Sequence, residues 1–194
     1  MKKALGSVLL LASVYAAAGE NYFQTAWDAK GLLALEGGFG QANPKETQDI
    51  NGGQYVINDS KVSSFSGGLK LGGESEDYRL FISARYHEVE DFDYAVTAGA
   101  EIQYLIRAGE NFNVFLGLNG GVMKSQKTVG PNEYTTSNPY VGGDAGVNID
   151  ITNNFGVELG ARVNKAIVGS SNVATIDYIA EGYASLVIKF TGEY

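Results

Sequence analysis

The chain has 194 residues, a formal net charge of −8, no cysteine and a single histidine. An acidic chain without clustered Lys and Arg lacks the charge pattern that binds nucleic-acid phosphates, and a chain without cysteine is not a disulfide-stapled scaffold. One histidine also excludes a histidine-rich metal site, so we expect neither a metal nor another cofactor.

The N-terminal segment has the features of a secretory signal peptide. Lys2 and Lys3 precede an apolar run at 4–11, and small alanines at 16–18 suit cleavage after Ala18. The apolar run is shorter than the roughly 20 residues that a transmembrane helix needs. Removing residues 1–18 leaves 176 residues with a net charge of −10, a length that suits one domain.

The remainder of the chain alternates between apolar and polar residues, with polar and glycine-rich interruptions, which predicts an all-β protein. We expect residues 19–31 to be a periplasmic lead-in segment and residues 32–194 to form one β-barrel. Several runs are long enough to cross a bilayer at a tilt, which takes about 9 to 11 residues. The eight expected strands are 32–42, 62–73, 78–88, 94–106, 112–123, 140–151, 155–167 and 176–190.

Each run has one apolar and one polar face. In the fourth run, Val96, Ala98 and Ile102 share one side, and Thr97 and Glu101 share the other. Alternation alone does not decide which face points outward, because a soluble lipocalin-like carrier would have the same period with its apolar side inward.

The lengths of the connections distinguish the two ends of the expected barrel. The longer connections are 43–61, 89–93, 124–139 and 168–175, and the shorter ones are 74–77, 107–111 and 152–154. Long and short connections alternate along the chain, so each kind lies at one end. Outer-membrane barrels have short periplasmic turns and longer external loops.

Aromatic residues on the apolar face gather near the ends of the runs, as in the two aromatic girdles of a membrane barrel. The expected girdle residues are Phe39, Tyr78, Tyr86, Tyr94, Tyr104, Phe112, Phe155, Tyr178 and Phe190.

The polar face carries charges of both signs, which would be costly against lipid and are therefore expected inside the barrel. An eight-stranded barrel has a bore just wide enough for side chains to fill, and five acids facing four bases suggest a paired network. The expected interior ion-pair network comprises Glu36, Lys70, Arg85, Glu101, Asp144, Glu158, Arg162, Glu181 and Lys189.

The chain resembles the small eight-stranded outer-membrane barrels, a porin-like family that includes the OmpA transmembrane domain, OmpX and the Opa-like proteins. The last run is similar to that family's assembly signal through Leu186, Ile188, Phe190 and Tyr194, although Gly192 stands where a bulky apolar residue is usual. The resemblance implies an antiparallel up-and-down transmembrane β-barrel in the outer membrane of a Gram-negative bacterium. It also implies a monomer that contacts membrane lipid and lipopolysaccharide and is inserted by the outer-membrane assembly machinery.

Function is expected to reside in the loops, because exposed loops on a rigid scaffold commonly carry binding sites. Loops 43–61 and 124–139 are polar and suit a structural or adhesin-like role toward an unknown extracellular ligand. The alternatives are a narrow channel for ions or small solutes, a lipid A-modifying enzyme and a soluble lipocalin-like carrier.

Catalysis is not expected. His87 would need a serine within hydrogen-bond reach to act in a hydrolase, and its neighbours along the chain offer none. The acidic segment 88–93 lacks the ligand spacing of a calcium loop and is interpreted as solvated surface charge.

Overall fold

The computed structural model describes residues 30–50, 53–167 and 174–190. The expected signal peptide, all but the last two residues of the expected lead-in segment, and Tyr194 lie outside these ranges. No helix in the described ranges has an apolar stretch long enough to cross a membrane.

The described residues form nine antiparallel strands joined in one sheet. Their bounds are β1 (Lys30–Ile50), β2 (Gly53–Asp59), β3 (Val62–Glu74), β4 (Tyr78–Val89), β5 (Tyr94–Arg107), β6 (Phe112–Val129), β7 (Asn132–Thr152), β8 (Phe155–Ala166) and β9 (Ala174–Phe190).

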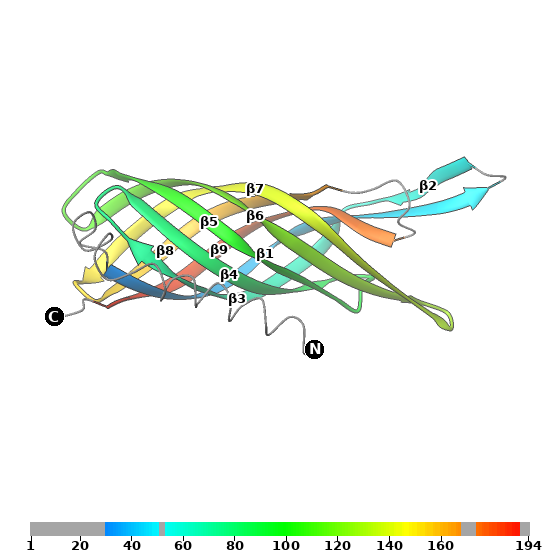
Figure 1. Ribbon diagram of the computed structural model, residues 1–194, viewed down its shortest axis with the longest axis horizontal. Helices are drawn as coiled ribbons and strands as arrows, with labels where there is room; N and C mark the ends of the chain where they lie inside the picture. The colour runs from blue at the N-terminus through cyan, green and yellow to red at the C-terminus, as the bar shows by residue number, and fades with distance from the viewer. Residues whose placement is uncertain (1–29, 51–52, 168–173, 191–194) are drawn as a thin grey trace, which may run out of the picture.

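The sheet closes on itself through the pairing of its first and last strands. Consecutive strands from β3 to β9 are neighbours, and β1 pairs with both β3 and β9. β2 pairs only with the distal part of β1, so the barrel proper has eight strands, β1 and β3 to β9 (Figure 1). This confirms the predicted up-and-down β-barrel.

The register fixes the tilt of the strands. Following the paired residues around the barrel from Gly31 on β1 leads back to β1 at Gln41, ten residues further along the chain. A stagger of this kind requires strands tilted by about 35–45° to the barrel axis. Eight strands at that tilt enclose a bore that side chains can fill.

Apolar side chains point outward and polar ones inward. On β4, Leu80 and Ile82 are 49% and 47% exposed, whereas Arg85 and His87 are buried in the bore. A water-soluble carrier would show the opposite arrangement. The outer surface therefore suits hydrocarbon, as expected for a transmembrane barrel.

All nine expected girdle aromatics lie on the outward face, although Tyr94, Phe155 and Tyr178 are only partly exposed. The rings of Tyr78 and Tyr104 pack with centroids 5.2 Å apart. At the other end, Phe39 packs at 4.9 Å against Phe65, a girdle residue that the sequence analysis missed. On β4, Tyr78 and Tyr86 are separated by about 21 Å along the barrel axis, taking about 3.4 Å per residue and a tilt of about 40°, which approaches the apolar band of about 25 Å.

Three of the four expected assembly-signal residues lie on the outward face of the last described strand. Leu186 and Phe190 are about half exposed, and Ile188 lies on the same face. β9 ends at Phe190 within the described residues.

The prediction that the segments 43–61 and 124–139 are loops is wrong, because both are mostly strand. β6 and β7 stay paired without a register shift from Phe112 and Ile149 to Val129 and Asn132, and β1 pairs with β2 up to Ile50 and Gly53. In 124–139 the buried positions Ser125, Thr136 and Asn138 are polar as well, so the apolar and polar alternation that predicts a strand disappears while the backbone pairing continues. β1 begins at Lys30, two residues before the expected first strand.

The lipid-facing assignment predicts a depth-dependent effect of charge. Leu118 is 70% exposed and lies midway between Phe112 and Lys124 along the outward face of β6. We expect Leu118→Arg to lower the free energy of unfolding by roughly 2–4 kcal/mol, as for Arg near the bilayer midplane. Denaturant titration of the barrel refolded into phospholipid vesicles measures this change.

Thr135→Arg is the matched control, because Thr135 is exposed on the part of β7 that extends beyond the lipid-facing band. Its effect should stay within about 0.5 kcal/mol, as for ordinary surface substitutions. Equal effects of the two arginines would contradict the assignment of the outer surface to lipid.

Candidate functional site

The centre of the bore is a network of buried ion pairs organised around Glu36 on β1. Its Oε1 accepts hydrogen bonds from Arg85 Nε on β4 and from Arg162 Nη1 on β8, the latter at 3.0 Å. Arg162 Nη2 donates to Oε2 at 3.1 Å, and Lys70 Nζ lies 3.3 Å from the same oxygen. One carboxylate thus joins three cations from three strands.

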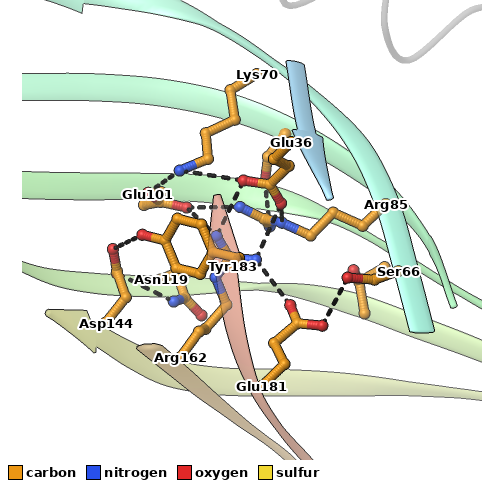
Figure 2. A network of polar contacts seen from close by, with 12 residues as sticks. Glu36, Ser66, Lys70, Arg85, Glu101, Asn119, Asp144, Arg162, Glu181 and Tyr183 are labelled. Atoms are coloured by element: carbon orange, nitrogen blue, oxygen red, sulfur yellow. Dashed lines mark hydrogen bonds and ion pairs between the residues drawn. The ribbon is translucent and has the colours of Figure 1, made fainter. Parts of the chain in front are cut away.

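Lys70 on β3 extends this network across the bore. Its Nζ lies 3.0 Å from Glu101 Oε1 on β5 and 3.3 Å from Glu158 Oε1 on β8. Arg85 Nη2 donates to Glu101 Oε2 at 2.8 Å. Figure 2 shows Lys70, Arg85 and Glu101 converging with Arg162 at the centre of the bore.

Two further groups adjoin the centre. On one side, Glu181 on β9 accepts hydrogen bonds from Arg162 Nη1 at 3.0 Å and from Ser66 Oγ at 2.7 Å. On the other, Arg79 lies 2.6 Å from Glu74 and 3.5 Å from Glu158. Glu74 and Asp150 both accept hydrogen bonds from Lys189 Nζ at 3.0 Å.

The nine charged residues expected in the bore all point inward and are buried or nearly so. Eight of them form ion pairs with one another or with further charged residues, whereas Asp144 forms none with a residue that the structure describes. Sequence reasoning missed the inward charges Glu74, Arg79 and Asp150. Arg79 shares the parity of Arg85 along one strand, which could have identified it.

Buried ion pairs of this kind close the bore, although they give no guarantee of net stability. Desolvating two charges is costly, and removing one partner leaves the other uncompensated. Each central carboxylate except Asp144 has at least one Arg or Lys within 4 Å. The network therefore acts as a mutually compensated plug.

A second plug lies toward the end of the barrel that carries the β1–β2 and β6–β7 hairpins, which we call the hairpin end. It is an apolar cluster inside the bore, partly covered by Val62 and Phe92. Its buried members are Ala42, Val89, Ala95, Met123, Tyr140, Ala166, Ile176 and Ile179. The bore is thus filled at two levels, by charges and by apolar side chains.

His87 lies between these two levels. Its Nε2 is 3.0 Å from Thr97 Oγ1 and its Nδ1 is 3.8 Å from Glu181 Oε2. The adjacent strand places Ser66 opposite His87, a serine that a search along the chain does not find. Ser66 donates to Glu181 instead, and the fully buried imidazole has no access to substrate.

Both long hairpins project beyond the barrel at the same end (Figure 1). The outer part of the β6 strand of this hairpin is braced by the turn between β4 and β5. Thr128 Oγ1 donates to Asp93 Oδ2 at 2.7 Å, the Lys127 ammonium lies 5.4 Å from the Phe92 ring centroid, and Tyr94 donates to Gln126 at 3.0 Å. Part of the acidic segment 88–93 thus has a structural role.

The start of β9 braces the other side of the same hairpin. Thr136 Oγ1 donates to the backbone carbonyl of Ala174 at 2.8 Å, and Asn138 Nδ2 donates to Thr175 Oγ1 at 3.0 Å. The β1–β2 hairpin is tied at its base by an ion pair of 3.1 Å between Lys45 and Asp177. These contacts hold the bases of both hairpins against the rim.

The comparisons with known proteins bear on the fold alone. No protein-family model matches the sequence, and no curated protein sequence matches it significantly. Among solved structures, Neisserial surface protein A is similar with a TM-score of 0.65 and 16% identity, over 84% of this chain and 99% of that protein. Outer membrane protein H of P. aeruginosa is similar with a TM-score of 0.53 and 17% identity, over 83% of this chain and 99% of that protein.

Both are outer-membrane proteins, and their full length is matched by the closed barrel seen here. Their low identity carries no inference about ligands or partners. The outward apolar face, the charged bore and these likenesses together establish that the chain has the fold of the small eight-stranded outer-membrane β-barrels.

Proposed function

We propose that this protein resides in the outer membrane of a Gram-negative bacterium and serves a non-enzymatic, surface-recognition role through its two projecting hairpins. The observation that carries the proposal is their construction, since both continue the barrel ladder beyond the lipid-facing band and are braced at their bases. A braced strand pair loses little conformational entropy when it binds a partner.

The charged bore supports a location for function outside the barrel. A lumen filled by paired ions and by an apolar cluster leaves the projecting hairpins as the part of the molecule best placed to meet another molecule. We propose that the barrel contacts lipid and lipopolysaccharide along its sides, acts as a monomer and meets an extracellular ligand with the hairpins.

Shortening the hairpins tests this role. One variant replaces residues 126–135 by Asn-Gly, which joins the paired residues Ser125 and Thr136 through a two-residue turn. A second replaces residues 46–58 by Asn-Gly between the paired Lys45 and Asp59. We expect the doubly shortened protein to reduce adhesion of the expressing cells to an epithelial monolayer by about tenfold or more, the effect of losing about 1.4 kcal/mol of binding energy.

The single-hairpin variants serve as matched controls and show which hairpin matters. Heat-modified gel mobility verifies that every variant has folded, and detergent sensitivity of the cells reports on envelope integrity. Unchanged adhesion by the doubly shortened protein would reject recognition by the hairpins, and a loss of envelope integrity alone would favour a purely structural role.

The filled bore generates a prediction about conductance, which addresses the alternative of a narrow channel. Because Lys70 bridges β3 to β5 and β8 across the lumen, we expect the purified barrel to give no stepwise conductance in planar bilayers at neutral pH. Reproducible unitary steps from heat-shifting, folded protein would reinstate the channel hypothesis.

The same cross-bore contacts predict a stability effect. Lys70→Met removes the cation that three glutamates share, so we expect a loss of about 3–5 kcal/mol in the free energy of unfolding, as for breaking a buried pair from one side. Lys45→Met removes a cation whose side chain is 35% exposed and should cost about 1 kcal/mol or less. Denaturant titration in vesicles compares the two variants. Equal losses would show that the central ion pairs contribute no more to stability than the exposed pair of Lys45.

A further inference from the structure

Asp144 on β7 differs from the other carboxylates at the centre of the bore. Its residue is 6% exposed, yet no Arg or Lys of the described residues forms an ion pair with it. The four central glutamates, by contrast, each lie within 4 Å of at least one Arg or Lys. These glutamates are Glu36, Glu101, Glu158 and Glu181.

Within the described ranges, Asp144 makes its hydrogen-bond contacts with uncharged groups. Oδ2 lies 3.1 Å from Gln103 Nε2 and 3.2 Å from the Tyr183 hydroxyl, and Oδ1 lies 3.5 Å from Asn119 Nδ2. Figure 2 shows Tyr183 and Asn119 approaching Asp144 at the side of the network away from Glu181. The nearby bases Lys70 and Arg162 are each engaged with three glutamates instead.

The cations of the central network are already engaged without Asp144. Four glutamates face four cations, one of which, Arg79, also pairs with Glu74 at 2.6 Å, so an ionised Asp144 would add a further buried anion with no cation of its own. An isolated buried charge is costly enough that such a group neutralises itself by changing its protonation state. The eight residues are Glu36, Glu101, Glu158, Glu181, Lys70, Arg79, Arg85 and Arg162.

A count of hydrogens points the same way. The Tyr183 hydroxyl has one hydrogen but lies 3.2 Å from Asp144 Oδ2 and 3.0 Å from Glu158 Oε1. Gln103 Nε2 has two hydrogens but faces three carboxylate oxygens, those of Glu101, Asp144 and Glu158, at 2.8, 3.1 and 3.5 Å. If all three acids were ionised, some of these contacts would have no hydrogen between their two heavy atoms.

We propose that Asp144 is a proton-binding site, which holds one proton on its carboxyl group in the folded barrel at neutral pH. The Asp144 carboxyl then donates to the Tyr183 oxygen, and the Tyr183 hydroxyl donates to Glu158. Each of these two oxygen–oxygen contacts then contains one hydrogen.

The charged and titratable groups around this site come from four strands. They are Lys70 on β3, Glu101 on β5, Glu158 and Arg162 on β8, and Tyr183 on β9. Because the four strands are fixed by the closed ladder, the site is built into the folded barrel and does not exist in the unfolded chain.

Infrared spectroscopy of the full-length mature barrel in phospholipid vesicles tests the proposal. We expect a carbonyl stretch of a protonated carboxyl group at neutral pH, shifted in D2O and lost in Asp144→Asn. The control is Asp150→Asn, which makes the same substitution in a carboxylate paired with Lys189 and should leave the band unchanged. The urea midpoint should be preserved in Asp144→Asn, where an amide replaces a neutral acid, and lowered in Asp150→Asn.

Isotope labelling keeps the test independent of any variant's folding. Aspartate labelled with ¹³C at its carboxyl carbon should shift the band in the wild-type protein, and Tyr183→Phe should move it by removing its hydrogen-bond acceptor. Absence of the band from the folded wild-type barrel, its persistence in folded Asp144→Asn, or a shift with labelled glutamate in place of aspartate would each overturn the assignment to Asp144.

Discussion

The closed backbone ladder is the constraint on which the rest of this structure depends. Hydrocarbon offers no hydrogen-bond partners, so a lipid-exposed sheet edge would leave a row of unsatisfied amide and carbonyl groups. The long pairing of β1 with β9 removes that edge. Closure with eight strands then fixes a narrow lumen, and the two-residue period of each strand sends every second side chain into it.

This geometry explains why the interior is charged and also why it must be nearly balanced. The outward positions have to be apolar, whereas the inward positions can be polar only if each buried group finds a partner. Glu36, Lys70 and Arg162 meet from three strands that are far apart in sequence. This three-way contact is a property of the closed barrel, because it needs side chains from β1, β3 and β8 together.

The sequence was sufficient for features that depend on local periodicity. The number of barrel strands, the outward face and the inward position of charges such as Glu101 and Arg162 follow from alternation and turn parity. It was insufficient where the information is nonlocal: which base meets which acid depends on the stagger around the barrel, and Ser66 lies opposite His87 only through the pairing of β3 with β4. The projecting parts of β6 and β7 were missed because their buried positions, such as Thr136 and Asn138, are polar like their exposed ones, so the sequence carries no hydrophobic period there.

The same ladder that seals the wall also gives the molecule its asymmetry. At one end it stops at short turns, whereas at the other the β1–β2 and β6–β7 pairs continue without support from a complete barrel. A two-stranded ribbon is only marginally stable in water by itself, so these extensions depend on contacts at their bases, including Thr136 with Ala174 and Lys45 with Asp177. Contacts that hold a solvated ribbon in place do not contribute to sealing the barrel, and this is the physical ground on which we propose a role in recognition for the hairpins.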